Sequence, residues 1–191
     1  RCISAAGGPP PAGKSLLTLA AAVRSGSGRP GTVAEHAQML ACGVHLVQGV
    51  TSPAQARGLG SLWSEVAEAA RGSEVDVIAD LGRLDRGSVT MPIAQASDFL
   101  VPVAAASLES VMHLRDQLPE LTLAIRQHGP GRIAPVLVGP DAHAARDCGD
   151  LDALLERTGV DVAAANPVTV DPRALQRLEA GEKGTGRLGR S

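Results

Sequence analysis

Short apolar runs alternate along the chain with longer stretches of helical pattern. The runs are GVHLVQG (residues 43–49), VDVIAD (75–80), DFLVPVA (98–104), RIAPVLVG (132–139) and VDVAAAN (160–166). Runs of this length and composition are typical of parallel strands that are buried on both faces. The pattern therefore predicts a strand at each of these positions, all joined into one mostly parallel sheet.

The stretches between the runs carry the signals of helix ends. Ser52 is an N-cap candidate with Pro53 at the first helical position, and the pattern stops at Gly72. Similar signals predict helices over residues 107–118, 150–159 and 171–181. Strands separated by helices of this length form right-handed crossovers. The sequence therefore predicts a doubly wound α/β fold with a mostly parallel sheet and helices on both of its faces.

Composition limits the class of protein. With 191 residues, 44% hydrophobic and 20% charged, the chain has the make-up of one globular domain, which we expect over residues 1–181. The glycine-rich basic stretch 182–191 predicts a flexible tail. Aromatic residues are limited to one Trp and one Phe, and the net charge is −2, so neither a stacking platform nor a basic footprint for nucleic acid is indicated.

The cysteines and histidines do not form a metal-ligand pattern. Cys2, Cys42 and Cys148 lack C-x-x-C spacing, and the histidines are equally scattered. Free buried thiols of a cytoplasmic protein are therefore favoured over a disulfide framework or a zinc site. The sequence contains neither an apolar stretch that could span a membrane nor a signal-peptide pattern, and we expect a cytoplasmic protein.

Ligands of doubly wound sheets bind beyond the carboxyl ends of the strands. Asp80 is the last residue of the predicted strand 75–80 and therefore lies at such an end. Two interpretations of Asp80 are open. The carboxylate can hold a magnesium ion through water while Gly82 lets the backbone approach a terminal phosphate. Alternatively, Asp80 ends the strand and caps the turn that follows.

The stretch GPPPAGKS, from Gly8 to Ser15, matches the phosphate-loop pattern G-x-x-x-x-G-K-[ST]. Such a loop wraps phosphates with consecutive backbone N–H groups, and three of its variable positions here are proline, which has none. The preceding residues RCISAA are a poor buried strand. A Pro/Gly-rich connector before a helix is therefore favoured. The weaker alternative is a nucleotide cradle built from Gly8, Gly13, Lys14 and Ser15.

Four motifs, in this order along the chain, resemble the MinD/ParA class of P-loop ATPases: LLTLAAAVRSG (16–26), DVIADLGRLDRGS (76–88), SDFLVPVAAASLES (97–110) and VDPRAL (170–175). The closest resemblance is to the divergent actinobacterial branch labelled as chromosome-partitioning or septum-site ATPases, over residues 16–191. It implies ATP and Mg as cofactors and a homodimer. It also implies that Asp80 is the Walker B aspartate, holding magnesium through water, and that Gly82 to Asp85 form the switch, with Asp85 as a second catalytic residue.

The same resemblance implies where the residues Gly8 to Ser15 fall in the family's order of motifs. It implies that the phosphate loop and the first strands precede Arg1, that Lys14 is a solvent-exposed connector lysine, and that this chain binds nucleotide weakly or not at all. Gly139 and Pro140 occupy the place of the family's adenine-contacting asparagine. Two alternatives remain: a non-catalytic α/β interaction module derived from this family, and an intact P-loop NTPase or kinase that uses Gly8–Ser15.

Overall fold

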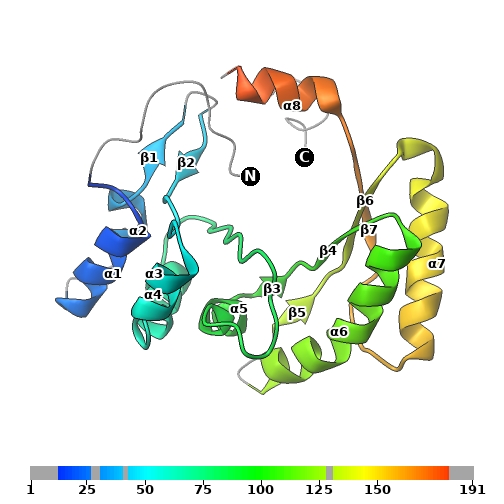
Figure 1. The fold of residues 1–191 in the computed structure, drawn as a ribbon, viewed down its shortest axis with the longest axis horizontal. Coiled ribbons are helices and arrows are strands. Elements are labelled where there is room, and N and C mark those ends of the chain that lie inside the picture. The colour runs from blue at the N-terminus through cyan, green and yellow to red at the C-terminus, as the bar shows by residue number, and fades with distance from the viewer. Residues whose placement is uncertain (1–12, 27–30, 41–42, 128–130, 181–191) are drawn as a thin grey trace. The chain divides into compact units, whose positions relative to one another are not determined.

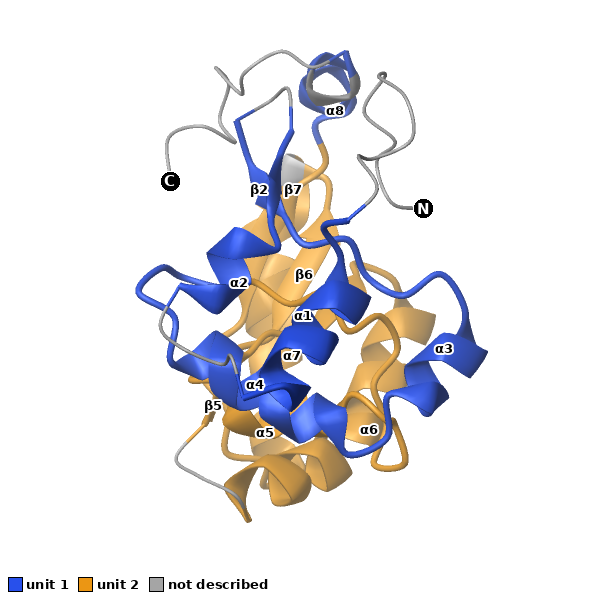
Figure 2. Cartoon of the chain, turned by 90° about the vertical axis from the view of Figure 1, so that its left-hand side faces the viewer, with its two compact units in different colours: residues 1–77, 171–191 blue, residues 78–170 orange. Residues whose placement is uncertain are grey.

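The computed structural model describes residues 13–26, 31–40, 43–127 and 131–180. The chain divides into two compact units: unit 1 comprises residues 1–77 and 171–191, and unit 2 comprises residues 78–170 (Figure 2). The expected single domain over residues 1–181 stays a prediction, because two compact units can belong to one folding domain. The expected tail lies outside the described residues.

A parallel sheet forms the centre of unit 2. Its strands are β3 (Phe99–Leu100), β4 (Val103–Ala105), β5 (Arg132–Ile133), β6 (Val136–Gly139) and β7 (Asn166–Thr169). β3 pairs with β5, β4 with β6, and β6 with β7, all in parallel. The N–H of Val136 donates to the carbonyl of Pro102 at 2.9 Å, so the pairing runs on through the prolines between β3 and β4 and between β5 and β6. The strands predicted over 98–104 and 132–139 are therefore confirmed.

The last strand begins later than predicted because the chain bulges before it. Ala163 and Asn166 donate to the carbonyls of Ile133 and Pro135, at 2.8 and 3.0 Å. Since these donors are one residue further apart than their acceptors, the backbone carries an extra residue there. The N–H of Ala165 is thereby left out of the ladder, and Oδ1 of Asp152 accepts it at 2.8 Å. The bulge therefore shifts β7 to residues 166–169, beyond most of the apolar run 160–166.

Helices α6 (Leu108–Arg126) and α7 (Ala144–Arg157) cover one face of this sheet (Figure 1). α5 (Met91–Ala96) packs on α6, and a short 3₁₀ turn, η1 (Asp141–His143), precedes α7. The core between helices and sheet is aliphatic: Leu114, Leu118, Leu151 and Leu155 pack with Ala104, Ile133, Leu137 and Cys148. Aliphatic side chains thus supply the burial that drives this unit to fold.

Helix α6 is longer than the predicted 107–118. Ser107 is its N-cap and accepts the N–H of Ser110 at 3.3 Å, as the sequence suggests. The helix then continues through Pro119, although proline lacks the N–H of the helical ladder. Leu121 and Ile125, beyond the proline, are buried against α5 in a second core cluster. Burial of this second apolar turn offsets the missing hydrogen bond.

The opposite face of the sheet carries exposed apolar side chains. Phe99, Val101 and Val103 are 55%, 48% and 64% exposed, and they alternate with Leu100 and Ala104, which face the core.

The helices and parallel strands of unit 2 form a mixed α/β fold. The doubly wound arrangement with helices on both faces stays a prediction.

Unit 1 is built mainly from helices. They are α1 (Leu16–Arg24), α2 (Thr32–Glu35), α3 (Pro53–Gly58), α4 (Leu62–Arg71) and α8 (Pro172–Glu179), with a two-stranded antiparallel sheet of β1 (Gln38–Met39) and β2 (His45–Leu46). α1 packs on α4 (Figure 1). Leu19 and Trp63 are buried, and the indole N–H of Trp63 donates to the carbonyl of Ala56 at 2.8 Å.

The helix predicted over residues 52–72 is interrupted. Ser52 caps α3 by accepting the N–H of Gln55 at 3.2 Å, and Pro53 stands at the first turn, both as predicted. The helix ends at Gly58, and α4 begins at Leu62. Between them Gly60 has φ 50°, a left-handed conformation that glycine adopts without strain and that an α-helix does not contain. The prediction of one continuous helix is therefore wrong.

Two of the predicted strands are also wrong in part or in whole. Within 43–49 only His45 and Leu46 form a strand, which is antiparallel and exposed, and Gln48 adds one isolated parallel bridge to Ser15. Residues 75–80 form no strand, and Ile78 is 97% exposed. A β-strand requires a neighbour for its N–H and C=O groups, and within the described ranges no strand pairs with this run.

Candidate functional site

The start of α1 is tied to its own surroundings by backbone hydrogen bonds. Ser15 is the N-cap, in an extended conformation, and its hydroxyl accepts the N–H of Thr18 at 3.4 Å. The N–H of Ser15 donates to Oγ1 of Thr18 at 3.0 Å, completing a capping box. The N–H of Leu16 donates to the carbonyl of Gln48 at 2.8 Å. The backbone donors at this helix start are thus largely taken by the protein.

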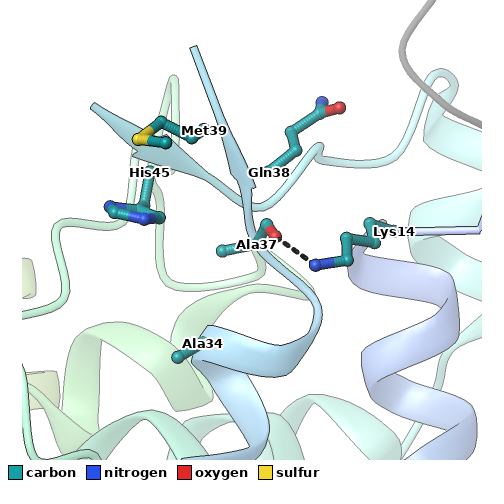
Figure 3. Close-up of a pocket in the computed structure, with 6 residues that line it drawn as sticks. All are labelled: Lys14, Ala34, Ala37, Gln38, Met39 and His45. Atoms are coloured by element: carbon teal, nitrogen blue, oxygen red, sulfur yellow. Dashed lines mark hydrogen bonds between the residues drawn. The ribbon is translucent and has the colours of Figure 1, made fainter. Parts of the chain in front are cut away.

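This geometry bears on whether Gly13, Lys14 and Ser15 fit a nucleotide. Lys14 is exposed, and its Nζ donates to the carbonyl of Ala37 at 3.0 Å (Figure 3). A phosphate loop needs free N–H groups, a lysine that reaches the outer phosphates and a hydroxyl that reaches magnesium. Here the lysine and the Ser15 hydroxyl are both engaged with backbone groups of the chain. In this conformation these residues do not fit a triphosphate; Gly8 lies outside the described residues.

A pocket of about 430 Å³ lies beside Lys14 in unit 1 (Figure 3). Its lining consists of Lys14, Ala34, Ala37, Gln38, Met39 and His45. The sequence pattern did not indicate this pocket. Its walls come from the connector before α1, from the end of α2 and from the hairpin strands, and only a long-range contact such as that of Lys14 with Ala37 brings them together.

The loop after residue 80 is held to the core by apolar side chains and carries polar groups at the surface. Leu81 and Leu84 pack against the cluster that contains Met91. The residues beside them, Asp80, Gly82 and Asp85, are exposed. The structure therefore brings these three predicted site residues into one solvent-facing loop.

Both carboxylates of this loop accept backbone hydrogen bonds. Oδ1 of Asp80 accepts the N–H of Gly82 at 2.9 Å, and Gly82 has φ 61°, which favours glycine. Oδ1 of Asp85 accepts the N–H of Gly87 at 2.8 Å and the hydroxyl of Ser88 at 3.2 Å. These are the turn-capping contacts that aspartate makes with the backbone two residues on. One oxygen of Asp80 takes part in its cap, and the carboxylate remains at the surface.

Gly139 stands at the end of β6, where the backbones approach closely. A Cβ built on it would lie 2.6 Å from Cβ of Ala106. The close approach gives a packing reason for glycine at this position.

Over the described ranges, no group of three or more His, Cys, Asp or Glu side chains is placed to hold a metal ion. Within those same ranges, no helix has both the length and the apolar character needed to cross a membrane.

Cys148 is the buried free thiol of α7; Cys2 and Cys42 lie outside the described residues. Burial raises the pKa of the Cys148 thiol, and the nearby charges of Asp152 and Asp147 raise the pKa further. The thiolate is the reactive form, so this cysteine has the surroundings of an inert structural residue.

We expect Cys148 to make stability fall at alkaline pH. Because the folded pKa lies above the unfolded one, the unfolded chain loses its thiol proton first, and the free energy of unfolding declines as pH rises past the unfolded pKa of about 8.5. Urea denaturation between neutral pH and pH of about 10 measures this decline, and Cys148→Ala should make it shallower. An unchanged pH dependence in the variant would contradict the assignment.

Comparison with known protein families, with curated proteins and with solved structures gives no match for this chain.

Proposed function

We propose that this chain forms the sheet and switch-loop part of a MinD/ParA-like ATPase, a nucleotide-dependent positioning switch for chromosome partitioning, septum siting or secretion assembly. The proposal includes a doubly wound fold, ATP and Mg as cofactors of the complete protein, a homodimeric active state and a cytoplasmic location. It rests on the sequence resemblance and on one structural observation, the loop from Asp80 to Asp85.

The loop has the features that a phosphate-sensing switch needs. Leu81 and Leu84 fix its base to the core, while Asp80, Gly82 and Asp85 face solvent. Oδ1 of Asp80 holds the N–H of Gly82, which orients the carboxylate and leaves Oδ2 for a water molecule of a magnesium ion. Bound ATP–Mg supplies the terminal phosphate whose presence or loss such a loop registers. The turn caps of Asp80 and Asp85 give the loop a defined resting conformation in the absence of that phosphate.

This chain by itself should bind ATP–Mg only at millimolar concentration or more weakly, because the groups at the start of α1 are engaged with the protein's own backbone. Isothermal titration calorimetry with ATP and magnesium measures this affinity. We expect the wild type, Lys14→Ala and the control Arg24→Ala, at the other end of α1, to give the same weak signal. Micromolar binding that Lys14→Ala abolishes, with Arg24→Ala unchanged, would place the phosphate loop at Gly8–Ser15.

The second candidate function is a non-catalytic α/β interaction module derived from the same family. The observation that favours it is the exposed apolar face at Phe99, Val101 and Val103. Exposed contiguous apolar surface marks interaction sites in soluble proteins. A module of this kind binds a protein partner irrespective of nucleotide, whereas a switch ATPase changes its partner affinity when ATP–Mg is added.

A further inference from the structure

The apolar pattern of the last strand continues through the bulge that precedes β7. Val160, Val162 and Ala165 pack against the core cluster beneath α6 and α7, so the interval between core-facing residues changes from two to three at the bulge. In the sequence, apolar residues nevertheless recur at even positions beyond the bulge, at Val168 and Val170. In a strand without a bulge, even-numbered residues would all share the face of Val160 and Val162. The apolar pattern therefore fits a ladder that has no bulge.

In the structure the bulge turns Val168 to the other face of the sheet. Leu137, which belongs to the buried core cluster, is the register partner of Pro167, and Val138 is the partner of Val168. Because successive side chains of a strand point to opposite faces, Pro167 lies on the face that the helices cover and Val168 on the opposite face. The observed register thus leaves unused an apolar packing that the sequence would allow.

Pro167 is the residue that excludes a ladder without the bulge. The N–H of Asn166 donates to the carbonyl of Pro135 at 3.0 Å, so Pro167, one residue on, directs its backbone away from β6. A ladder without the bulge shifts the pairing by one residue and turns Pro167 toward the carbonyl of Leu137. Proline has no N–H to donate, so this carbonyl of the central strand would lose its partner. The proline is compatible with the observed register and incompatible with the other.

Asp152 stabilises the bulge from α7. Its Oδ1 accepts the N–H of Ala165, the donor that the bulge removes from the ladder, at 2.8 Å. A backbone N–H left without an acceptor inside a protein costs free energy, so the carboxylate lowers the cost of the extra residue. One side chain therefore supports the bulged register, and one residue of the strand blocks its alternative.

We propose that β7 has two registers and that Pro167 holds it in the bulged one. In the second register the bulge is absent, and the residues after Ala163 advance by one position along β6, about 3.3 Å. The two valines of the even positions then turn to the face that the helices cover. The N–H of Ala165 enters the ladder, so Asp152 is no longer needed as its acceptor. The slip also turns the polar Asn166 to the helix side, which offsets part of the apolar gain.

A double-mutant test of stability distinguishes this device from ordinary packing. Asp152→Ala should lower the urea midpoint, because the N–H of Ala165 loses its acceptor while Pro167 still prevents the slip. Adding Pro167→Ala should restore about half of that loss or more, because the strand can then pair without the bulge. Pro140→Ala, at an exposed position just after β6, is the matched control and should restore none of it. Additive losses, with no rescue beyond that of the control, would overturn the proposal.

NMR spectroscopy measures the register directly. In the wild type, cross-strand NOEs should join Val168 to Val138, its register partner in the structure. In the double variant Asp152→Ala/Pro167→Ala they should join Val168 to Gly139, whereas Asp152→Ala alone should keep the wild-type pattern. An unchanged pairing of Val168 with Val138 in the double variant would exclude the second register.

Amide exchange of the single variant Pro167→Ala tests the proposal even if the double variant does not fold. The N–H of Val168 points to β6 in the bulged register and outward in the second one. Population of the second register should therefore speed the exchange of this amide at least about tenfold relative to Pro140→Ala. Equal exchange rates in the two variants would contradict the proposal. None of these measurements requires nucleotide, so their outcome is independent of the ATP titration.

Discussion

Leu118→Ala is expected to lower the free energy of unfolding by about 2–5 kcal/mol. Leu118 is 0% exposed, near the middle of α6, and packs in the cluster that joins the helices to the sheet. Truncation removes its buried methyl groups and leaves a cavity between α6, α7 and the strands. The surrounding strands are fixed by their ladder, so they cannot move in to fill the space completely.

The effect of Leu118→Ala is measured by urea denaturation followed by far-ultraviolet circular dichroism. The matched control is Leu123→Ala on the same helix, where the side chain is 53% exposed. The control should change stability by no more than about 0.5 kcal/mol, as exposed sites usually do. Equal losses in the two variants would mean that α6 is not buried through the face that contains Leu118.

Gly139→Ala is expected to destabilise the protein by about 1–3 kcal/mol, in contrast to most glycine-to-alanine changes outside turns. The new Cβ would lie 2.6 Å from Cβ of Ala106, a backbone-anchored atom that cannot rotate away. Either β6 or the start of the segment after β4 must shift. That shift disturbs the hydrogen bond from the N–H of Ala106 to the carbonyl of Val138, now 2.9 Å long.

Gly149→Ala provides the control for this substitution. Gly149 lies within α7, and a Cβ built on it meets no atom within 4 Å. Alanine should there stabilise the helix by about 0.5–1 kcal/mol, because it loses less conformational freedom on folding than glycine. Thermal unfolding of both variants gives opposite signs if the close approach at Gly139 exists. A neutral or stabilising Gly139→Ala would contradict it.

The sequence predicted two parallel strands of unit 2 well, at 98–104 and 132–139, and misplaced or wrongly predicted the other three. DFLVPVA and RIAPVLVG pair with each other and pack one face against α6 and α7, so local composition and three-dimensional surroundings agree on that face. VDVIAD has the same composition, yet a strand exists only where a neighbour supplies hydrogen bonds, and the sequence of one segment does not contain that information. Periodicity therefore identified the capacity of residues 75–80 to form a strand, but not whether they do.

The helix starts at Ser52 and Ser107 were predicted correctly, whereas α7 begins at Ala144, before the predicted residue 150. The caps at Ser52 and Ser107 depend on a hydroxyl and on N–H groups three residues away, so a short stretch of sequence determines them. The break at Gly60 and the continuation through Pro119 depend on whether the next turn can be buried. That balance is decided by tertiary packing, which outweighs intrinsic propensity.

The candidate site also combines a feature that the local sequence determines with one that the tertiary fold determines. The turn that presents Asp80 and Gly82 is encoded locally, by a carboxylate two residues before the N–H that it accepts. The engagement of Lys14 joins residues 23 positions apart and follows from the path of the chain between them. The letters of a phosphate-loop motif specify donors, and the surrounding fold determines whether those donors remain available.

The fluorescent aromatic side chains are distributed unevenly between the two units. Trp63, 4% exposed and hydrogen-bonded to Ala56, is the one indole in the sequence and belongs to unit 1. Unit 2 contains Phe99 and neither tryptophan nor tyrosine. Intrinsic fluorescence excited at the indole band therefore monitors the surroundings of α4, while events at the sheet or at the Asp80 loop emit no signal of their own and require an introduced fluorophore.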